Sequence, residues 1–249
     1  MDTRLYLQRI EVAEPVQQTL EGLTLLQKRH VTRVPFENLD ILRGIPIALR
    51  TGDLFDKLVN QRRGGVCYEL NGLFCELLRR IGFETHMIAA TVYRGESQWG
   101  TEGSHATNLV RLEGRLYLVD VGFGGNSPRR PVPITGEEIQ DADGFYRIRA
   151  YPELRNGYIL EKKEERDWTI LYRFDLEPKQ LEDFAEVCNE TQYAPESPFN
   201  KVYFLMKVTE AGRMTLFDHS LTVVDGPTKA KETIEAGRID DILERFLAP

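Results

Sequence analysis

The stretch Arg63-Gly64-Gly65-Val66-Cys67-Tyr68-Glu69-Leu70-Asn71 is the segment around which the rest of the chain can be ordered. Its adjacent glycines interrupt one element, and apolar residues then recur at helical spacing, namely Leu70, Leu73, Phe74, Leu77 and Leu78. Basic residues followed by a glycine, as in Arg79-Arg80-Ile81-Gly82, are typical of the end of a helix. The pattern therefore predicts a helix that begins near Cys67 and ends near Gly82.

The predicted position of Cys67 places its sulfur in an environment of positive electrostatic potential. The first amides of a helix have no partner within the helix, and the helix dipole is positive at that end. Arg62 and Arg63 lie just upstream, and all these charges favour a thiolate, which is the nucleophilic form of cysteine. The alternative is that the glycines only allow close backbone packing and that Cys67 is a small buried hydrophobic residue. This stretch alone leaves both interpretations open.

Length and composition limit the class of protein. The 249 residues can bury most of their surface in one large domain or in two or three packed subdomains. A net charge of −7 argues against general nucleic-acid binding. Three cysteines without dense or paired spacing favour a reducing, cytoplasmic setting, and four scattered histidines argue against a metal site. Residues 1–10 lack the pattern of a secretory leader, and no apolar run is long enough to span a membrane.

The period of the hydrophobic pattern changes after Gly82. Residues 2–83 are mostly helical in pattern, with Pro35 placing Phe36 in an extended connection. Short alternating segments then predict an antiparallel sheet or barrel, with strands at 85–93, 106–112, 115–121, 146–150, 158–160 and 168–174. We interpret the charged run 161–167 as a solvated hairpin turn. The tail predicts strands over 202–208 and 214–224 and a helix over 233–246.

A cysteine nucleophile needs a base, and the base needs an orienting partner. The chain offers four histidines, which are His30, His86, His105 and His219. If Glu113-Gly114 is the two-residue turn of a hairpin, His105 and Asp120 become diagonal neighbours on one face. Diagonal partners have Cα atoms roughly 7–8 Å apart, close enough for an imidazole to bind a carboxylate. This register therefore predicts that His105 and Asp120 serve Cys67.

Asp120 is the lone acid in an otherwise apolar strand, so it needs a partner, and His105 is the nearest one. A hairpin-end histidine bound only to backbone remains the alternative for His105. Asp218 and His219 form a rival pair. The glycine-rich run 121–130 that follows Asp120 could direct amides at a phosphate or merely form a turn.

Four segments together resemble the arylamine N-acetyltransferase family in order and spacing. They are Pro35-Phe36-Glu37-Asn38-Leu39, the stretch from Arg63 to Asn71, the strand beginning at His105, and Val119-Asp120-Val121-Gly122-Phe123-Gly124. The resemblance implies an α+β fold with a cysteine protease-like core. Its parts would be an N-terminal helical bundle (1–84) carrying the nucleophile, a central antiparallel β-barrel (85–190) carrying the histidine and aspartate, and a C-terminal α/β lid (191–249).

The resemblance also implies an activity. It implies a catalytic triad of Cys67, His105 and Asp120, with acetyl-CoA as co-substrate and no metal. A ping-pong reaction through acetyl-cysteine would acetylate the nitrogen of arylamines or arylhydrazines, or the oxygen of N-hydroxyarylamines. The enzyme would then act on small molecules, bind neither nucleic acid nor membrane, and be a monomer or weak homo-oligomer.

Flat acceptors of this kind need an aromatic cleft. Candidates for its lining are Phe36, Tyr93, Phe123 and Phe204, each of which could equally be an ordinary core residue. Candidates for contacts with CoA are Ser104, Gly124, Gly125 and Arg129.

Two alternatives to acetyl transfer stay open at this point. A papain-like or transglutaminase-like cysteine hydrolase or amidase would use the same three residues with water as the acceptor. A non-catalytic binding protein of the same fold would carry an unreactive Cys67.

Overall fold

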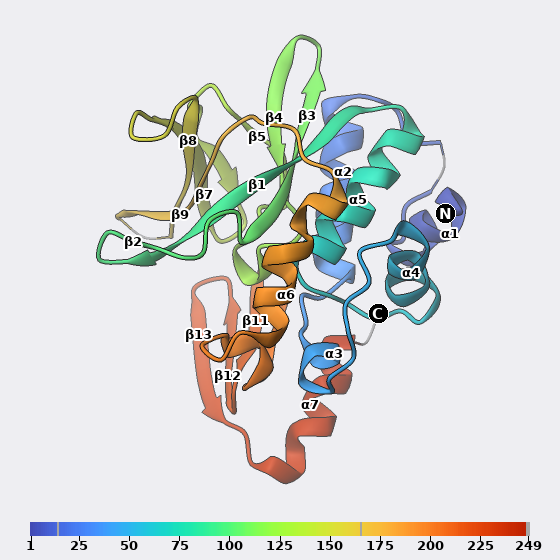
Figure 1. Ribbon diagram of the computed structural model, residues 1–249, viewed down its shortest axis with the longest axis vertical. Helices are drawn as coiled ribbons and strands as arrows, with labels where there is room; N and C mark the ends of the chain where they lie inside the picture. Colours follow the sequence, from blue (N-terminus) through green and yellow to red (C-terminus); the bar gives the residue numbers. More distant parts are fainter. Residues whose placement is uncertain (14, 165, 248–249) are drawn as a thin grey trace.

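The computed structural model describes residues 1–13, 15–164 and 166–247 and combines N-terminal helices, a large curved sheet and a smaller C-terminal sheet (Figure 1). The helical part contains α1 (Thr3–Arg9), α2 (Leu20–Arg33), α3 (Leu39–Leu42), α4 (Thr51–Phe55) with the π-helix η1 (Asp56–Asn60), and α5 (Cys67–Ile81). Among the described residues, no helix has both the length and the apolar character that crossing a membrane requires.

The predicted central helix is confirmed at both ends. Helix α5 begins at Cys67 and stops at Gly82, whose φ of +105° is the left-handed conformation that glycine adopts readily. The apolar residues at helical spacing, from Leu70 to Leu78, are fully buried among the other helices. Burial of this stripe fixes the rotation of the helix, and with it the direction in which Cys67 points.

The large sheet is antiparallel and curls into a nearly closed barrel. Its strands follow the order β5-β4-β3-β1-β9-β8-β7-β6, with β2 on β1, and β5 near one end contacts β7 near the other. The bounds are β1 (Glu84–Gly95), β2 (Gln98–Trp99), β3 (His105–Leu112), β4 (Arg115–Val119), β5 (Val132–Pro133), β6 (Ile139–Asp141), β7 (Gly144–Tyr151), β8 (Gly157–Lys163) and β9 (Trp168–Phe174). Helix α5 packs against β1 and β3, so the nucleophile helix lies directly on the barrel.

The interpretation of the charged run 161–167 as a solvated turn was wrong at its beginning. Strand β8 continues through Lys163, and both Glu161 and Lys162 are buried. Glu161 accepts hydrogen bonds from Arg147 and Arg149, at 2.8 Å each. Buried charges are tolerated when they are paired in this way. Glu165 lies outside the described residues.

The C-terminal sheet is larger than predicted. The apolar stretch over 214–224 is two strands, because the chain turns at Asp218, and a polar strand follows before the helix. The order is β10 (Phe204–Val208), β11 (Gly212–Phe217), β12 (Ser220–Asp225) and β13 (Thr228–Thr233). Helix α7 (Ile239–Leu247) packs its apolar residues on this sheet. The helix therefore begins later than position 233.

Phe36 joins the helical and C-terminal parts. Its backbone exchanges hydrogen bonds with Met206 of β10, at 2.8 and 2.9 Å, and it forms a bridge to Gly65, just before α5. Helix α6 (Ala185–Tyr193) packs on the helical core through Cys188. The division of the chain at residues 84 and 190 stays a prediction.

Candidate active site

The loop before α5 is held by close packing and buried charges. A Cβ at Gly64 would lie 2.1 Å from the carbonyl oxygen of Pro35, so this glycine is needed for backbone approach. The Glu69 carboxylate accepts the backbone N–H of Val66 at 2.9 Å and pairs with Lys57 at 2.8 Å. The site thus begins with a fixed helix start that carries Cys67 as its first residue.

The expectation that the upstream arginines act on the thiol needs correction. The Arg63 guanidinium pairs with Glu37 at 2.7 Å and with Asp40 at 2.9 Å, so its charge is balanced behind the helix start. Arg62 is exposed. The positive surrounding of Cys67 therefore comes from the first amides and dipole of α5.

The hairpin that carries the predicted base has the expected register. Leu112 pairs with Arg115 and Asn108 with Val119, as a two-residue turn at Glu113-Gly114 requires. The His105 Nε2 lies 2.7 Å from Asp120 Oδ2, and both side chains are almost fully buried. Sequence spacing alone therefore located this pair.

Three further donors hold the Asp120 carboxylate. Oδ2 also accepts the hydroxyl of Tyr172 at 2.8 Å, and Oδ1 accepts Asn71 Nδ2 at 2.9 Å and the N–H of Gly122 at 2.8 Å. Asn71 belongs to the opening stretch and lies one turn after Cys67 on α5, so it links the helix to the hairpin. The sequence analysis assigned no role to Asn71. The only indication in the sequence is an amide side chain next to the apolar face of the helix, where a buried polar group needs a hydrogen-bond partner.

Burial and pairing act in opposite directions on His105. Loss of hydration disfavours the imidazolium, whereas the charge and hydrogen bond of Asp120, with a smaller contribution from Cys67, raise the pKa of His105 to about 10. The same pairing lowers the pKa of Asp120 although burial opposes it. At neutral pH the pair is therefore an imidazolium and a carboxylate, and Cys67 also acts on this imidazole.

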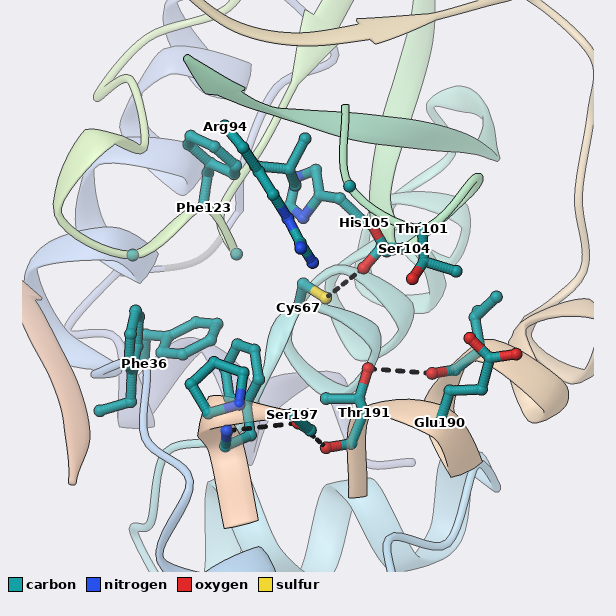
Figure 2. Close-up of a pocket in the computed structure, with 18 of the residues that line it drawn as sticks. Phe36, Cys67, Arg94, Thr101, Ser104, His105, Phe123, Glu190, Thr191 and Ser197 are labelled. Carbon is teal, nitrogen blue, oxygen red and sulfur yellow. Dashed lines mark hydrogen bonds between the residues drawn. The ribbon is translucent and has the colours of Figure 1, made fainter. Parts of the chain in front are cut away.

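A cavity of about 810 Å³ opens beside these residues (Figure 2). Cys67 and His105 line it, and so do five of the predicted contacts, which are Phe36, Ser104, Phe123, Gly124 and Phe204. Phe123 also packs edge-on against the His105 ring. The residues that sequence reasoning missed come from β1 and from the α6 region, notably Val92, Arg94, Glu190, Thr191 and Phe199.

Three predicted site residues, Tyr93, Gly125 and Arg129, lie outside the cavity lining. Tyr93 follows Val92 on β1 and points to the other face of the strand, where it packs edge-on against Trp99. Gly125 directs its N–H to the sulfur of Met206 at 3.1 Å, so this amide is already occupied.

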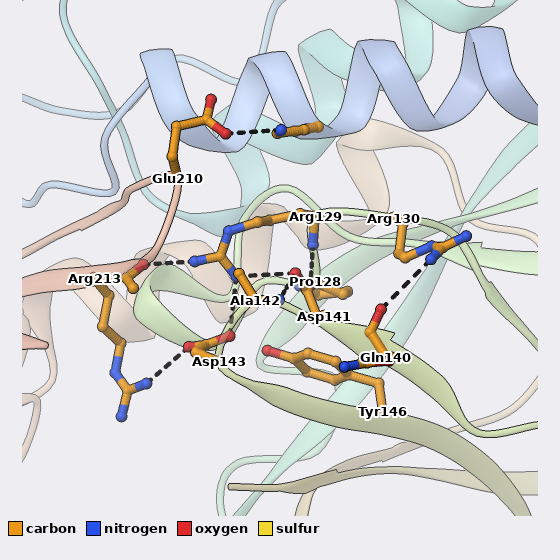
Figure 3. Close-up of polar contacts among 12 residues, drawn as sticks. Pro128, Arg129, Arg130, Gln140, Asp141, Ala142, Asp143, Tyr146, Glu210 and Arg213 are labelled. Atoms are coloured by element: carbon orange, nitrogen blue, oxygen red, sulfur yellow. Dashed lines mark hydrogen bonds and ion pairs between the residues drawn. The ribbon is translucent and has the colours of Figure 1, made fainter. Parts of the chain in front are cut away.

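Arg129 also lies apart from the cavity, in a buried charge cluster between barrel and C-terminal sheet (Figure 3). Four of the five guanidinium donors are used, on Asp141, Asp143 and the carbonyl oxygens of Thr209 and Gly212. Asp143 also pairs with Lys162 and Arg213, each at 2.9 Å. Arg129 is thus a packing residue, and we remove it from the proposed CoA contacts.

The other histidines lie elsewhere. His219 is 3.9 Å from Asp218 in the turn between β11 and β12, and the two side chains are 43% and 54% exposed. His30 is buried against Phe74 and Tyr6, whose hydroxyl is 2.9 Å from Nδ1. Neither residue lines the cavity.

Helix α5 places Cys67 at the wall of a cavity, next to the histidine–carboxylate pair of the barrel. This arrangement defines a class of enzyme that has a cysteine, a histidine and an acid at one site. Comparison with known proteins narrows the class. A family model described as N-acetyltransferase matches residues 19–247. An uncharacterized acetyltransferase of Bacillus subtilis is 34% identical over 204 residues, covering 82% of this chain and 80% of that protein. The arylamine N-acetyltransferase of Mycolicibacterium smegmatis is 32% identical over 256 residues, covering 99% and 91%.

A solved structure agrees in fold. An arylamine N-acetyltransferase from Bacillus cereus, described as having a unique Cys-His-Glu catalytic triad, matches with a TM-score of 0.89 and 34% identity over 98% of this chain and 97% of that one. In the present chain the acid bound to the histidine is an aspartate, Asp120. The chain belongs to the arylamine N-acetyltransferase family, and the protein is an acyltransferase. This assignment favours acyl transfer over the hydrolase and binding-protein alternatives.

Proposed function

We propose that this protein transfers an acetyl group from acetyl-CoA to the nitrogen of arylamines or arylhydrazines, or to the oxygen of N-hydroxyarylamines, by a ping-pong reaction through acetyl-Cys67. The observation that carries the proposal is the linked set of Cys67, His105 and Asp120 at the wall of an aromatic cavity. A triad in which the acid orients the base, and the base serves the sulfur, is the arrangement that nucleophilic acyl transfer requires.

In the first half-reaction the Cys67 thiolate attacks the thioester carbonyl, and a carbon–sulfur bond to the protein forms as the bond to CoA breaks. His105 gives its proton to the departing CoA sulfur and becomes neutral. Asp120, held by four donors, keeps the imidazole oriented throughout. The N–H of Cys67 at the start of α5 is available to the negative oxygen of the tetrahedral intermediate.

In the second half-reaction the amine attacks acetyl-Cys67. His105 removes the proton from the nitrogen, and the Cys67 thiolate is released as the amide forms. Phe36, Phe123 and Phe204 line the cavity and supply flat apolar surface for an aromatic ring. The volume of about 810 Å³ suits a small acceptor together with the thioester end of CoA.

Ser104, which lines the cavity, is one of the two residues that we propose as contacts for CoA. Its carbonyl oxygen accepts the Tyr68 hydroxyl at 2.9 Å and lies 3.9 Å from the Cys67 sulfur. Gly124 has a φ of +59°, and a side chain there would meet Met206. These residues are the proposed contacts for the thioester arm of CoA.

Intact-protein mass spectrometry after brief incubation with acetyl-CoA tests the proposal. We expect one added acetyl group on the Cys67 peptide, lost when aniline or phenylhydrazine is added. The variant Cys67→Ala should form no adduct, whereas Cys75→Ala, which removes a thiol buried in α5, should still form it. Absence of the adduct from wild-type protein, or turnover by Cys67→Ala, would refute the mechanism.

A further inference from the structure

Lys57 and Glu69 form a buried ion pair behind the helix start that carries the nucleophile. The Lys57 ammonium lies 2.8 Å from Glu69 Oε1 and 2.7 Å from Asp40 Oδ2, and the side chains of Lys57 and Glu69 are only 13% and 3% exposed. Taking two charges out of water costs free energy, and an apolar pair of similar size is often at least as stable. Stability alone therefore does not account for this pair, and the proposed chemistry uses neither residue.

Glu69 holds the start of α5 in place. Its Oε2 accepts the N–H of Val66, the residue directly before Cys67, at 2.9 Å. A Cβ at Gly65 would lie 2.6 Å from the same oxygen, so the carboxylate packs over the bare backbone of this glycine. The carboxylate thus fixes the two residues that precede the nucleophile.

The charge of Glu69 opposes the thiolate that the reaction needs. Cys67 is the first residue of α5 and Glu69 is the third, so both negative groups draw on the same positive end of the helix dipole. Two negative charges within one helical turn repel each other, and the repulsion is strong where water is excluded. A carboxylate at this position is therefore compatible with a reactive cysteine only if its charge is balanced.

Lys57 supplies this balance from a neighbouring element. It lies in the π-helical turn η1, where Gln61 donates to the carbonyl oxygen of Asp56 at 2.9 Å, and such turns are rare and often occur at functional sites. The carbonyl oxygen of Lys57 accepts the N–H of Arg63 at 3.1 Å, which ties η1 to the loop before α5. Burial alone would lower the pKa of Lys57, but the neighbouring carboxylates raise it, so the ammonium keeps its charge.

The other ionisable groups near the helix start have different partners. Besides Lys57, the groups that face Cys67 or Glu69 are Glu37 before α3, Tyr68 in α5, Arg94 in β1, His105 in β3, and Cys188 and Glu190 in α6. Glu37 is bound by Arg63 at 2.7 Å, and His105 is bound by Asp120. Loss of Lys57 would therefore leave the Glu69 charge without the cation that contacts it.

The thiol of Cys188 shows that the two charges act with opposite signs. Its pKa is raised by burial and by the charges of Cys67 and Glu69, whereas Lys57 lowers it. Cys188 and Cys67 belong to the same core. A sulfur in this core is thus disfavoured as a thiolate by Glu69 and favoured by Lys57.

We propose that Lys57 is a positioning residue for acyl transfer, whose ammonium neutralises Glu69 so that this carboxylate holds the start of α5 without weakening the Cys67 thiolate. The inference rests on the proposed function and deepens it, because it names a residue behind the helix start that keeps the nucleophile charged. Lys57 does not line the cavity and acts through Glu69.

Alkylation of Cys67 by iodoacetamide, followed over a range of pH by peptide mapping, measures the thiolate without acetyl transfer. In Lys57→Met, we expect the midpoint of this profile to rise by about one pH unit, so that alkylation on its acid side slows about tenfold. Lys57→Arg, which keeps the charge, should restore most of the rate. The matched control Lys28→Met removes the same group from an exposed ion pair with Glu210 and should leave the profile unchanged.

The double variant Lys57→Met, Glu69→Gln separates charge from structure. The amide oxygen of the glutamine can still accept the Val66 N–H, but neither charge remains, so the midpoint should return close to the wild-type value. A purely structural role predicts the opposite, because the double variant lacks the ion pair as completely as Lys57→Met does. A double variant as shifted as Lys57→Met, or an unchanged profile in Lys57→Met, would overturn the proposal.

Glu69→Gln alone decides the question if Lys57→Met does not fold. Loss of the carboxylate should lower the midpoint of alkylation, although the melting temperature falls because Lys57 loses a buried partner. An unchanged or higher midpoint in folded Glu69→Gln would refute the role of Lys57. Since these profiles involve no acyl transfer, the expected shifts in a protein that forms no acetyl-cysteine would refute the proposed function and leave the role of Lys57 standing.

Discussion

Asp120→Asn is the substitution that tests the electrostatics of the site most directly. The pKa of His105 is raised to about 10 mainly through Asp120, whereas an ordinary histidine titrates near 6.5. The difference of about 3.5 units corresponds to roughly 5 kcal/mol of preference for the imidazolium at about 1.4 kcal/mol per unit. Because burial alone would lower the pKa of His105, removal of the charge should leave a neutral imidazole at pH 7. We expect acetylation of Cys67 to slow by about three orders of magnitude.

The amide that Asp120→Asn introduces would also disturb hydrogen bonding. All four groups that contact the Asp120 carboxylate donate to it, so an NH₂ in place of one oxygen leaves donors without an acceptor. Each buried donor left unpaired costs about 1–3 kcal/mol. The variant should therefore melt earlier than wild type, and its fold must be checked by circular dichroism.

Stopped-flow measurement of CoA release gives the acetylation rate, and the rate of alkylation by iodoacetamide at pH 7 reports the thiolate. Both should fall together in folded Asp120→Asn. The same chemical change at the exposed pair, Asp218→Asn, is the matched control and should alter neither rate by more than about twofold. A folded Asp120→Asn protein that retains acetylation within about tenfold of wild type would refute the assigned role of this carboxylate.

Three further predictions concern the stability or activity of variants at buried positions, which are His30, Gly122 and Arg129. Burial lowers the pKa of His30 to about 3, so the neutral imidazole contributes its full stability above pH 6.5 and loses it as pH falls toward 3. Relative to His30→Gln, the free energy of unfolding of wild type in urea should fall by about 2 kcal/mol between pH 6.5 and 5. Parallel pH profiles of the two proteins would contradict this. A Cβ at Gly122 would lie 2.5 Å from the side chain of Asn71, so Gly122→Ala should lower both activity and melting temperature, whereas Gly52→Ala, with open space around it, should lower neither. Arg129→Met leaves two buried carboxylates short of a cation and should cost about 3–5 kcal/mol in urea unfolding. The control Arg115→Met, which removes an exposed ion pair, should cost less than about 1 kcal/mol. If Arg129→Met instead raised the KM for acetyl-CoA without loss of stability, Arg129 would be a CoA contact after all.

The local parts of the fold were predictable because their causes lie within short segments. The start of α5 follows from glycines and an apolar period, and the pairing of His105 with Asp120 follows from a two-residue turn. Both depend on the covalent spacing of the chain and need no knowledge of distant partners.

The parts that were mispredicted depend on distant contacts. Glu161 and Arg129 look like surface charges in the sequence, but residues from other strands neutralise them in the interior. Tyr93 was placed in the cleft, although only the curvature of the barrel decides which face of β1 borders the cavity. Strand β13 escaped notice because its residues are all exposed and have no apolar alternation.

The bridge between Phe36 and Met206 bears on the order in which the protein matures during synthesis. The segment that places the nucleophile is made early, but β10, which also supplies Phe204 to the cavity, leaves the ribosome only after the whole barrel. Because domains form as their residues emerge, the part of the cavity wall that Phe204 supplies is completed only when β10 docks on Phe36. The cavity beside Cys67 is therefore completed by a strand that is translated more than a hundred residues after the nucleophile.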